Sequence, residues 1–193
     1  AYVTLEPCSH HGRTPPCADA LVKAKVARVV VAMQDPNPLV AGEGIARLRE
    51  AGIQVDVGVM ETQARALNRG FISRMERQRP WLRLKMAMTL DGRTALANGQ
   101  SQWITGTAAR QDVHRYRAQS GAILTSARTV MMDQAQMTAR HPNTEKQPLR
   151  VVLDRQAQWP PSASFFAVES PILRVVDANQ PTPETAQQWP DHV

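Results

Sequence analysis

Apolar and polar positions in the first sixty residues switch repeatedly between the period of a strand and that of a helix. Short apolar runs predict strands over residues 2–5, 28–33 and 53–57, and the middle run is rich in β-branched residues, as in a strand buried on both faces. Apolar residues at helical spacing follow Pro16, and a second such run ends at Gly52. The alternation predicts a parallel sheet covered by helices.

A helix is predicted over residues 61–78, and the charged stretch 74–80 that ends it indicates a boundary between two units. We therefore expect domains over residues 1–75 and 81–193. The second begins with a strict alternation over 81–89, which predicts a strand with one apolar and one polar face. The polar face contains Lys85 and a gap at the small Ala87, and residues 90–93 are expected to turn the chain.

The next helix is predicted over residues 105–119, with Thr105 or Thr107 as its N-cap. One face carries an apolar stripe and another a basic stripe, and the basic one has two interpretations, a binding surface or a solvated helix face. Its members are Arg110, His114 and Arg117. Strands over 122–125 and 149–154 and a helix over 126–132 follow. No glycine occurs after Gly121, which excludes a glycine-rich phosphate loop from the last third of the chain.

Composition narrows the class of protein. The 193 residues are 42% hydrophobic, which disfavours wholesale disorder, and contain no apolar run that predicts a membrane span. Two cysteines are too few for a disulfide framework, and with no signal-peptide pattern they favour a reducing, cytoplasmic location. The net charge of +6 suits nucleic acid or small phosphorylated substrates.

The stretch TLEPCSHHGRTPPC, residues 4–17, carries the clearest candidate chemistry. Cys8 follows a predicted strand and Cys17 opens a predicted helix, where the helix dipole favours a thiolate, the form that binds zinc. Three interpretations remain open from the residues alone: two unrelated thiols, a closed structural zinc site completed by His10 or His11, or a catalytic zinc site of the deaminase type. If the two sulfurs hold one ion, they lie within about 4 Å of each other.

This stretch, together with VARVVVAMQDPNPLVAGEGI, LKMAMTLDGRTA and SQWITG, resembles the bifunctional deaminase–reductases of riboflavin biosynthesis over residues 1–155. The resemblance implies an α/β chain: the C-terminal part of a cytidine-deaminase-like three-layer domain, then the N-terminal part of a dihydrofolate-reductase-like domain. Cys8 and Cys17 match two zinc ligands of that family. Its third ligand and catalytic Glu belong to an upstream segment, so we expect an internal fragment without deaminase turnover, and Glu6 is not that Glu.

The resemblance also assigns a cofactor site and a substrate site to the second unit. The positions that match NADPH contacts are Ala87, Trp103, Thr129 and Asp133. Those that match contacts to the phosphorylated substrate are Ser101, Arg117, Met137 and Arg140. Guanidinium groups suit a phosphate dianion because they donate two parallel charge-assisted hydrogen bonds. Arg155 replaces a small serine of the family, and it either contacts a phosphate or obstructs the cavity.

We therefore predict that the parent enzyme of this chain performs zinc-dependent deamination of a pyrimidinone ribosylamine phosphate, then NADPH-dependent reduction of the ribosyl group to ribityl. Its partner is a small phosphorylated pyrimidine; neither nucleic acid nor membrane is expected, and a homo-oligomer is possible. The alternative is a basic zinc-binding nucleic-acid module. Spread-out basic residues and an aromatic content of 5% disfavour that alternative, because stacking platforms are scarce.

Overall fold

The computed structural model describes residues 1–157, 159 and 163–179. Contacts divide the chain into two compact units, Ala1–Leu84 and Lys85–Val193. Each unit contains a three-stranded sheet, and every pair of neighbouring strands in the described residues is parallel. The predicted α/β class with parallel strands is therefore confirmed. Within the described ranges, no helix is long and apolar enough to cross a membrane.

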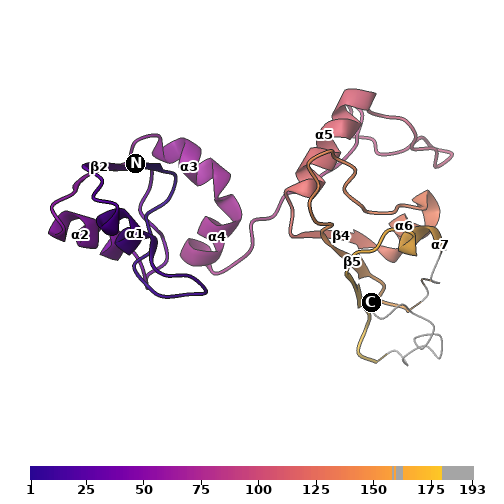
Figure 1. Ribbon diagram of the computed structural model, residues 1–193. Coiled ribbons are helices and arrows are strands. Elements are labelled where there is room, and N and C mark those ends of the chain that lie inside the picture. The colour runs from indigo at the N-terminus through magenta and orange to yellow at the C-terminus, as the bar shows by residue number, and fades with distance from the viewer. Residues whose placement is uncertain (158, 160–162, 180–193) are drawn as a thin grey trace. The chain divides into compact units, whose positions relative to one another are not determined.

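The sheet of the first unit is ordered β1-β2-β3, formed by Tyr2–Val3, Arg28–Val31 and Gln54–Val57 (Figure 1). The middle strand is the most buried, since Val29 and Val31 are both fully inaccessible to solvent. This agrees with the β-branched run in the sequence.

Four helices complete the first unit: α1 (Cys17–Lys23), α2 (Glu43–Glu50), α3 (Glu61–Leu67) and α4 (Arg69–Arg77). The first two bury Ala18 and Leu48 in the cluster around β2. The last two form a second cluster, in which Ala64 and Ile72 pack with Met33 just beyond the end of β2. The single helix predicted over 61–78 is thus two helices, because the backbone leaves helical geometry at Asn68.

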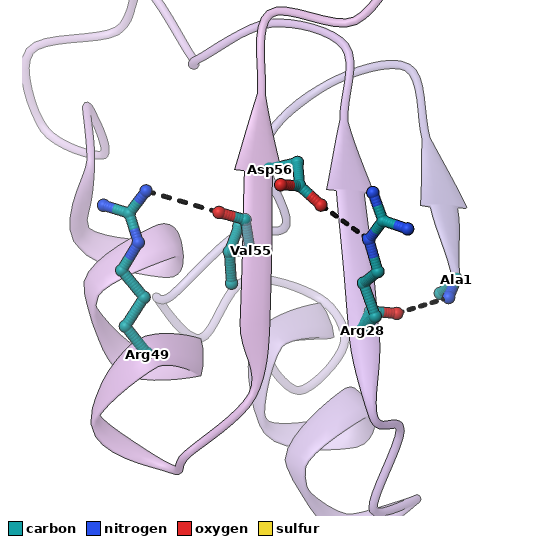
Figure 2. Close-up of polar contacts among 5 residues, drawn as sticks. All are labelled: Ala1, Arg28, Arg49, Val55 and Asp56. Carbon is teal, nitrogen blue, oxygen red and sulfur yellow. Dashed lines mark hydrogen bonds and ion pairs between the residues drawn. The ribbon is translucent and has the colours of Figure 1, made fainter.

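Polar contacts join the strands of this sheet at its surface (Figure 2). The amino group of Ala1 donates to the carbonyl of Arg28 at 2.7 Å, and Arg28 Nε donates to Asp56 Oδ2 at 2.6 Å. Arg49 of α2 donates to the carbonyl of Val55 in β3. Exposed ion pairs of this kind contribute little to stability, so the register of the strands depends mainly on the buried valines.

The sheet of the second unit is ordered β4-β5-β6, formed by Ala122–Ser126, Leu149–Leu153 and Ile172–Val175. Two short helices, α6 (Ala127–Asp133) and α7 (Ala163–Phe166), accompany it (Figure 1). The core of this unit is made of residues from β5, β6, α6, α7 and the segment that leads to α7: Ala127, Val130, Val152, Trp159, Phe165 and Ile172. Sequence patterning predicted β4, β5 and α6 but did not predict α7 or β6.

The predicted strand over residues 81–89 is wrong, because no strand is assigned there. Its apolar face is exposed: Leu82 and Leu84 each keep 83% of their accessible surface. Alternation alone does not make a strand, since a strand also needs a hydrogen-bonding neighbour. The sheet order of the described residues leaves this segment without one. The turn predicted after it is present, with Gly92 N–H bonded to the carbonyl of Thr89 at 2.9 Å.

The predicted helix over 105–119 is present as α5 (Thr107–Ala118), but its predicted cap is wrong. Gly106 occupies the N-cap position, and neither threonine caps a backbone N–H there. Both are instead used by Arg110, which donates to the carbonyl of Thr105 and, at 3.0 Å, to the hydroxyl of Thr107. The Thr107 hydroxyl thus accepts from a side chain and not from a backbone N–H at the start of the helix.

Candidate functional site

The second unit contains a cavity of about 620 Å³, a volume in the usual range for small-molecule sites. Its walls come from residues 85–87 and 101–105, from Arg110 and Arg117 of α5, and from the segment after α6 that ends at Arg140. The chain segments that build the cavity are therefore mostly loops, positioned by α5 and α6.

Most of the residues that the sequence predicted as binding residues line this cavity. They are Ala87, Ser101, Trp103, Arg117, Asp133, Met137 and Arg140, joined by Lys85. Thr129 is not among the lining residues. It is exposed in the first turn of α6, where its N–H donates to the capping hydroxyl of Ser126 at 3.2 Å. Arg155 is also exposed and outside the lining, so it does not obstruct this cavity.

Trp103 presents an aromatic surface at the cavity wall. Its side chain keeps 71% of its accessible surface, and the guanidinium carbon of Arg110 lies 4.4 Å from the ring centroid. This distance is typical of a cation–π contact, and two hydrogen bonds to the start of α5 hold the guanidinium there. The indole is thus positioned as an exposed platform and is not part of the apolar core.

Arg117 and Arg140 supply two positive charges to the same cavity. Arg117 Nη1 donates to the carbonyl of Thr138 at 3.0 Å, and Arg140 Nη1 donates to Gln136 Oε1 at 3.2 Å. Burial lowers the pKa of Arg117, and the nearby Arg140 lowers it further. In the described part of the chain no carboxylate forms an ion pair with either guanidinium. The arrangement suits an anionic ligand.

The basic stripe of α5 is therefore not a solvated helix face. Arg110, His114 and Arg117 are all partly buried, and each contacts one of the loops that line the cavity.

Three further side chains fix the loop of residues 136–140. Gln147 brackets Ala139, accepting its N–H at 2.9 Å and donating to its carbonyl at 2.9 Å. Arg150 Nη1 donates to the carbonyl of Gln136 at 3.2 Å, and His114 Nδ1 accepts the N–H of Arg140 at 3.2 Å. Sequence reasoning missed Gln147 and Arg150, and it treated His114 only as one member of a basic stripe.

Arg150 is the least expected of these residues, because it lies fully buried in the middle of β5. Its guanidinium bonds to Ser170 Oγ at 2.8 Å and to the carbonyls of Phe165, Val168 and Gln136, and it lies over the Phe165 ring. Burial lowers its pKa. Because oxygens satisfy its donors, this cation joins the cavity loop to α7 and the segment before β6.

The two cysteines of the first unit lie side by side. Cys8 Sγ accepts the backbone N–H of Cys17 at 3.3 Å, and the Cys8 thiol, by hydrogen bonding and by charge, raises the pKa of Cys17. The Cys8 sulfur thus opposes the thiolate that the helix start is expected to favour at Cys17.

The pair offers two sulfur ligands but not a complete zinc site. Across residues 1–157, 159 and 163–179, no group of three or more metal-ligating side chains gathers, and His10 and His11 are both exposed. A zinc site of either kind needs at least one more protein ligand than this pair provides.

Glu6, beside this pair, has a structural role. The residue is 4% exposed, and its carboxylate accepts four backbone N–H groups, from Asp35, Gly42, Gly44 and Ile45, at 2.9 to 3.2 Å. The last two belong to the first turn of α2, so Glu6 caps that helix from a distant part of the sequence. All of its acceptor capacity is used within the fold.

Comparison with known proteins gives consistent matches. Residues 80–189 match the RibD C-terminal domain family. The chain is 48% identical, over its whole length, to the riboflavin biosynthesis protein RibD of Escherichia coli, and covers 54% of that protein. It is also 48% identical to RibD of Aquifex aeolicus, where 87% of this chain and 47% of the relative are covered.

Solved structures agree. The diaminohydroxyphosphoribosylaminopyrimidine deaminase/5-amino-6-(5-phosphoribosylamino)uracil reductase of Thermotoga maritima matches with a TM-score of 0.86 at 36% identity, over 99% of this chain and 53% of that one. RibD of Acinetobacter baumannii matches with a TM-score of 0.79 at 45% identity, over 95% of this chain and 56% of that one. The chain spans about half the length of the curated relatives it matches. Because the matched residues make up more than half of its sequence, this chain belongs to the RibD C-terminal domain family.

Proposed function

We propose that the second unit forms part of a reductase site that binds NADPH and a phosphorylated ribosylamino-pyrimidine. The observation that carries the proposal is the cavity, which brings together the nucleotide-contact candidates Ala87, Trp103 and Asp133 and the substrate candidates. When bound, NADPH supplies the hydride that converts the ribosyl group to ribityl. This rests on the family membership and extends to this chain the activity named for the Thermotoga maritima protein.

The roles of the residues follow from their chemistry. Ala87 is small and half-buried, which leaves room for a flat ring to lie against the backbone, and Trp103 offers an exposed aromatic surface. Arg117 and Arg140 are proposed to hold the substrate phosphate, with Ser101 donating or accepting a further hydrogen bond. Both guanidiniums act on a remote group, so they orient the sugar and do not move the hydride.

The first unit is proposed to be part of a zinc deaminase domain, and the second to be part of a dihydrofolate-reductase-like domain. Cys8 and Cys17 would hold two positions of the zinc ion, whose chemistry when bound is to activate a water for attack on the amino-bearing carbon. The described residues do not complete the metal site. A cytoplasmic location and a small-molecule partner belong to the same proposal. No observation favours the nucleic-acid alternative.

A pair of variants in the full chain tests the reductase proposal by calorimetry, with NADPH and ribose 5-phosphate as probes. Arg117→Ala should weaken ribose 5-phosphate binding by about tenfold or more, since a hydrogen bond to a charged group contributes about 1.5–3 kcal/mol, and should leave NADPH binding within about twofold. Trp103→Ala should weaken NADPH binding and leave the affinity for ribose 5-phosphate nearly unchanged.

Arg128→Ala is the matched control, because Arg128 is exposed on α6 and outside the cavity lining. It should change neither affinity. Absence of binding of both probes to the unmodified chain, or equal losses of both in the two cavity variants, would overturn the proposal.

A further inference from the structure

His114 contacts Arg140 with both of its ring nitrogens. Nδ1 faces the backbone N–H of Arg140 at 3.2 Å, and Nε2 lies 3.1 Å from its Nη2. His114 itself is not part of the cavity lining, whereas Arg140 is. The imidazole therefore stands behind a cavity residue and touches it at both its backbone and its guanidinium.

The number of protons on the imidazole ring determines whether His114 can accept a hydrogen bond from Arg140. Both groups of Arg140 are donors, and a neutral imidazole has one acceptor nitrogen, while an imidazolium has none. Only the neutral ring can accept a hydrogen bond from Arg140. Burial lowers the pKa of His114, and the charges of Arg140 and Arg117 lower it further, against a smaller opposing effect of the Thr138 carbonyl.

We propose that His114 is a positioning residue, whose neutral imidazole accepts the backbone N–H of Arg140 at Nδ1 and so fixes the loop that presents this guanidinium to the phosphate end of the cavity. With Nδ1 as the acceptor, Nε2 carries the proton and lies beside Nη2 as a neighbour without accepting from it. The inference rests on the proposed function, because it assigns Arg140 to an anionic ligand. Fixing the backbone of a loop residue costs conformational entropy. A contact that fixes it before the ligand arrives removes that cost from binding.

The other contacts of Arg140 do not replace this one. Its Nη1 reaches Gln136 Oε1 at 3.2 Å and Thr138 Oγ1 at 3.4 Å, so these acceptors engage one end of the guanidinium. His114 Nδ1 accepts the backbone N–H of Arg140, and His114 lies on α5, a different element from the loop that carries Arg140. It therefore ties the loop to the helix that also carries Arg117.

The test measures binding of ribose 5-phosphate to the full chain by calorimetry in His114→Leu and His114→Gln. Leucine removes the acceptor, and affinity should fall about three- to tenfold, the equivalent of one hydrogen bond. Glutamine keeps an acceptor and cannot titrate, so it should restore affinity to within about twofold. Gln111→Leu, an exposed position on the same helix, controls for a new leucine on α5 and should bind as the unmodified chain does.

Thermal melting of each variant separates positioning from folding, because a purely structural role predicts that affinity follows stability and not the presence of an acceptor. If His114→Leu melts early, His114→Phe replaces it as a ring without an acceptor. Wild-type affinity in the Leu or Phe variant overturns the inference, and so does a loss in His114→Gln equal to that in His114→Leu. If the unmodified chain does not bind ribose 5-phosphate, or if Arg117→Ala binds it as tightly as the unmodified chain does, the proposed function itself fails. Failure of the proposed function is thereby distinguished from failure of the inference about His114.

Discussion

Replacing Glu6 by glutamine tests how much one buried carboxylate stabilises the first unit. Each carboxylate oxygen accepts two N–H groups: Oε2 those of Asp35 and Gly42, Oε1 those of Gly44 and Ile45. Glutamine keeps one oxygen and places an NH₂ group at the other site. Two N–H groups then face a donor, whichever way the amide is turned.

The magnitude follows from that count. Hydrogen bonds to a charged acceptor contribute about 1.5–3 kcal/mol each, so the loss of two predicts a destabilisation of about 3–6 kcal/mol. A loss of this size is a large fraction of the total free energy of unfolding of a domain. Large destabilisations of this kind are expected when buried donors lose their hydrogen-bond partner. Glu6→Asp should also destabilise, because the shorter side chain cannot reach the start of α2.

The assay must report on the first unit alone, because two units can unfold separately. Amide hydrogen exchange, read by mass spectrometry on peptides from residues 1–84, gives the opening free energy of that unit. The matched control is Glu43→Gln, an exposed acidic residue in the first turn of α2, which should cost no more than the helix-dipole range of about 0.3–1 kcal/mol. A change below about 1 kcal/mol for Glu6→Gln would refute the reasoning.

Three further predictions concern other parts of the molecule. Gly44→Ala places a Cβ at 1.9 Å from the backbone carbonyl oxygen of Pro7, so we expect a destabilisation of about 3 kcal/mol in the same exchange assay, and protection equal to wild type would contradict it. Because the pKa of His114 is lower in the folded chain than its ordinary value of 6.5, the unfolded chain binds more protons than the folded chain at pH values between the two pKa values. Stability of the second unit should therefore rise with pH across this window and be lost as pH falls through the folded value; exchange measured against pH should show this dependence weakened in His114→Gln. Zinc should bind the full chain through Cys8 and Cys17, so Cys8→Ser and Cys17→Ser should each reduce the affinity at least tenfold in calorimetry, and unchanged binding in both would remove the pair as ligands.

Sequence patterning located those helices and strands whose formation depends on residues close together in the sequence. The buried run at β2 and the helix stop at Gly52 are set by residues that are neighbours in the sequence. The segment 81–89 shows the limit, because its alternation matches a strand while its pairing depends on a neighbour that patterning does not supply. The strand β6 is formed by the short run ILRV, which is too brief to show a strand period by itself.

The candidate site divides in the same way. Family resemblance pointed to residues that the structure places in the wall of the cavity, such as Trp103 and Arg140. It did not locate Gln147 or Arg150, which act on the site only through the fold. Gln147 is eight residues from the backbone it brackets, and Arg150 reaches back 14 residues to Gln136. Residues of this kind can be identified only from the tertiary packing. In the sequence, the arginine in the run LRVVL interrupts an apolar strand, and only the structure shows the carbonyl groups that bind it.

The electrostatics of the cavity give an independent reason to expect an anion. Burial lowers the pKa of Arg117, and the nearby charge of Arg140 lowers it further. The acceptors bonded to the two guanidiniums are a backbone carbonyl, a side-chain amide and a hydroxyl. Neutral partners satisfy the donors but do not cancel the repulsion, so the unliganded fold carries a cost that a dianion would remove. Fixing like charges in place ahead of a ligand is typical of a preorganised binding site. It follows that an anion which binds between them should stabilise the second unit by RT ln(1 + [L]/Kd), while the stability of the first unit stays the same.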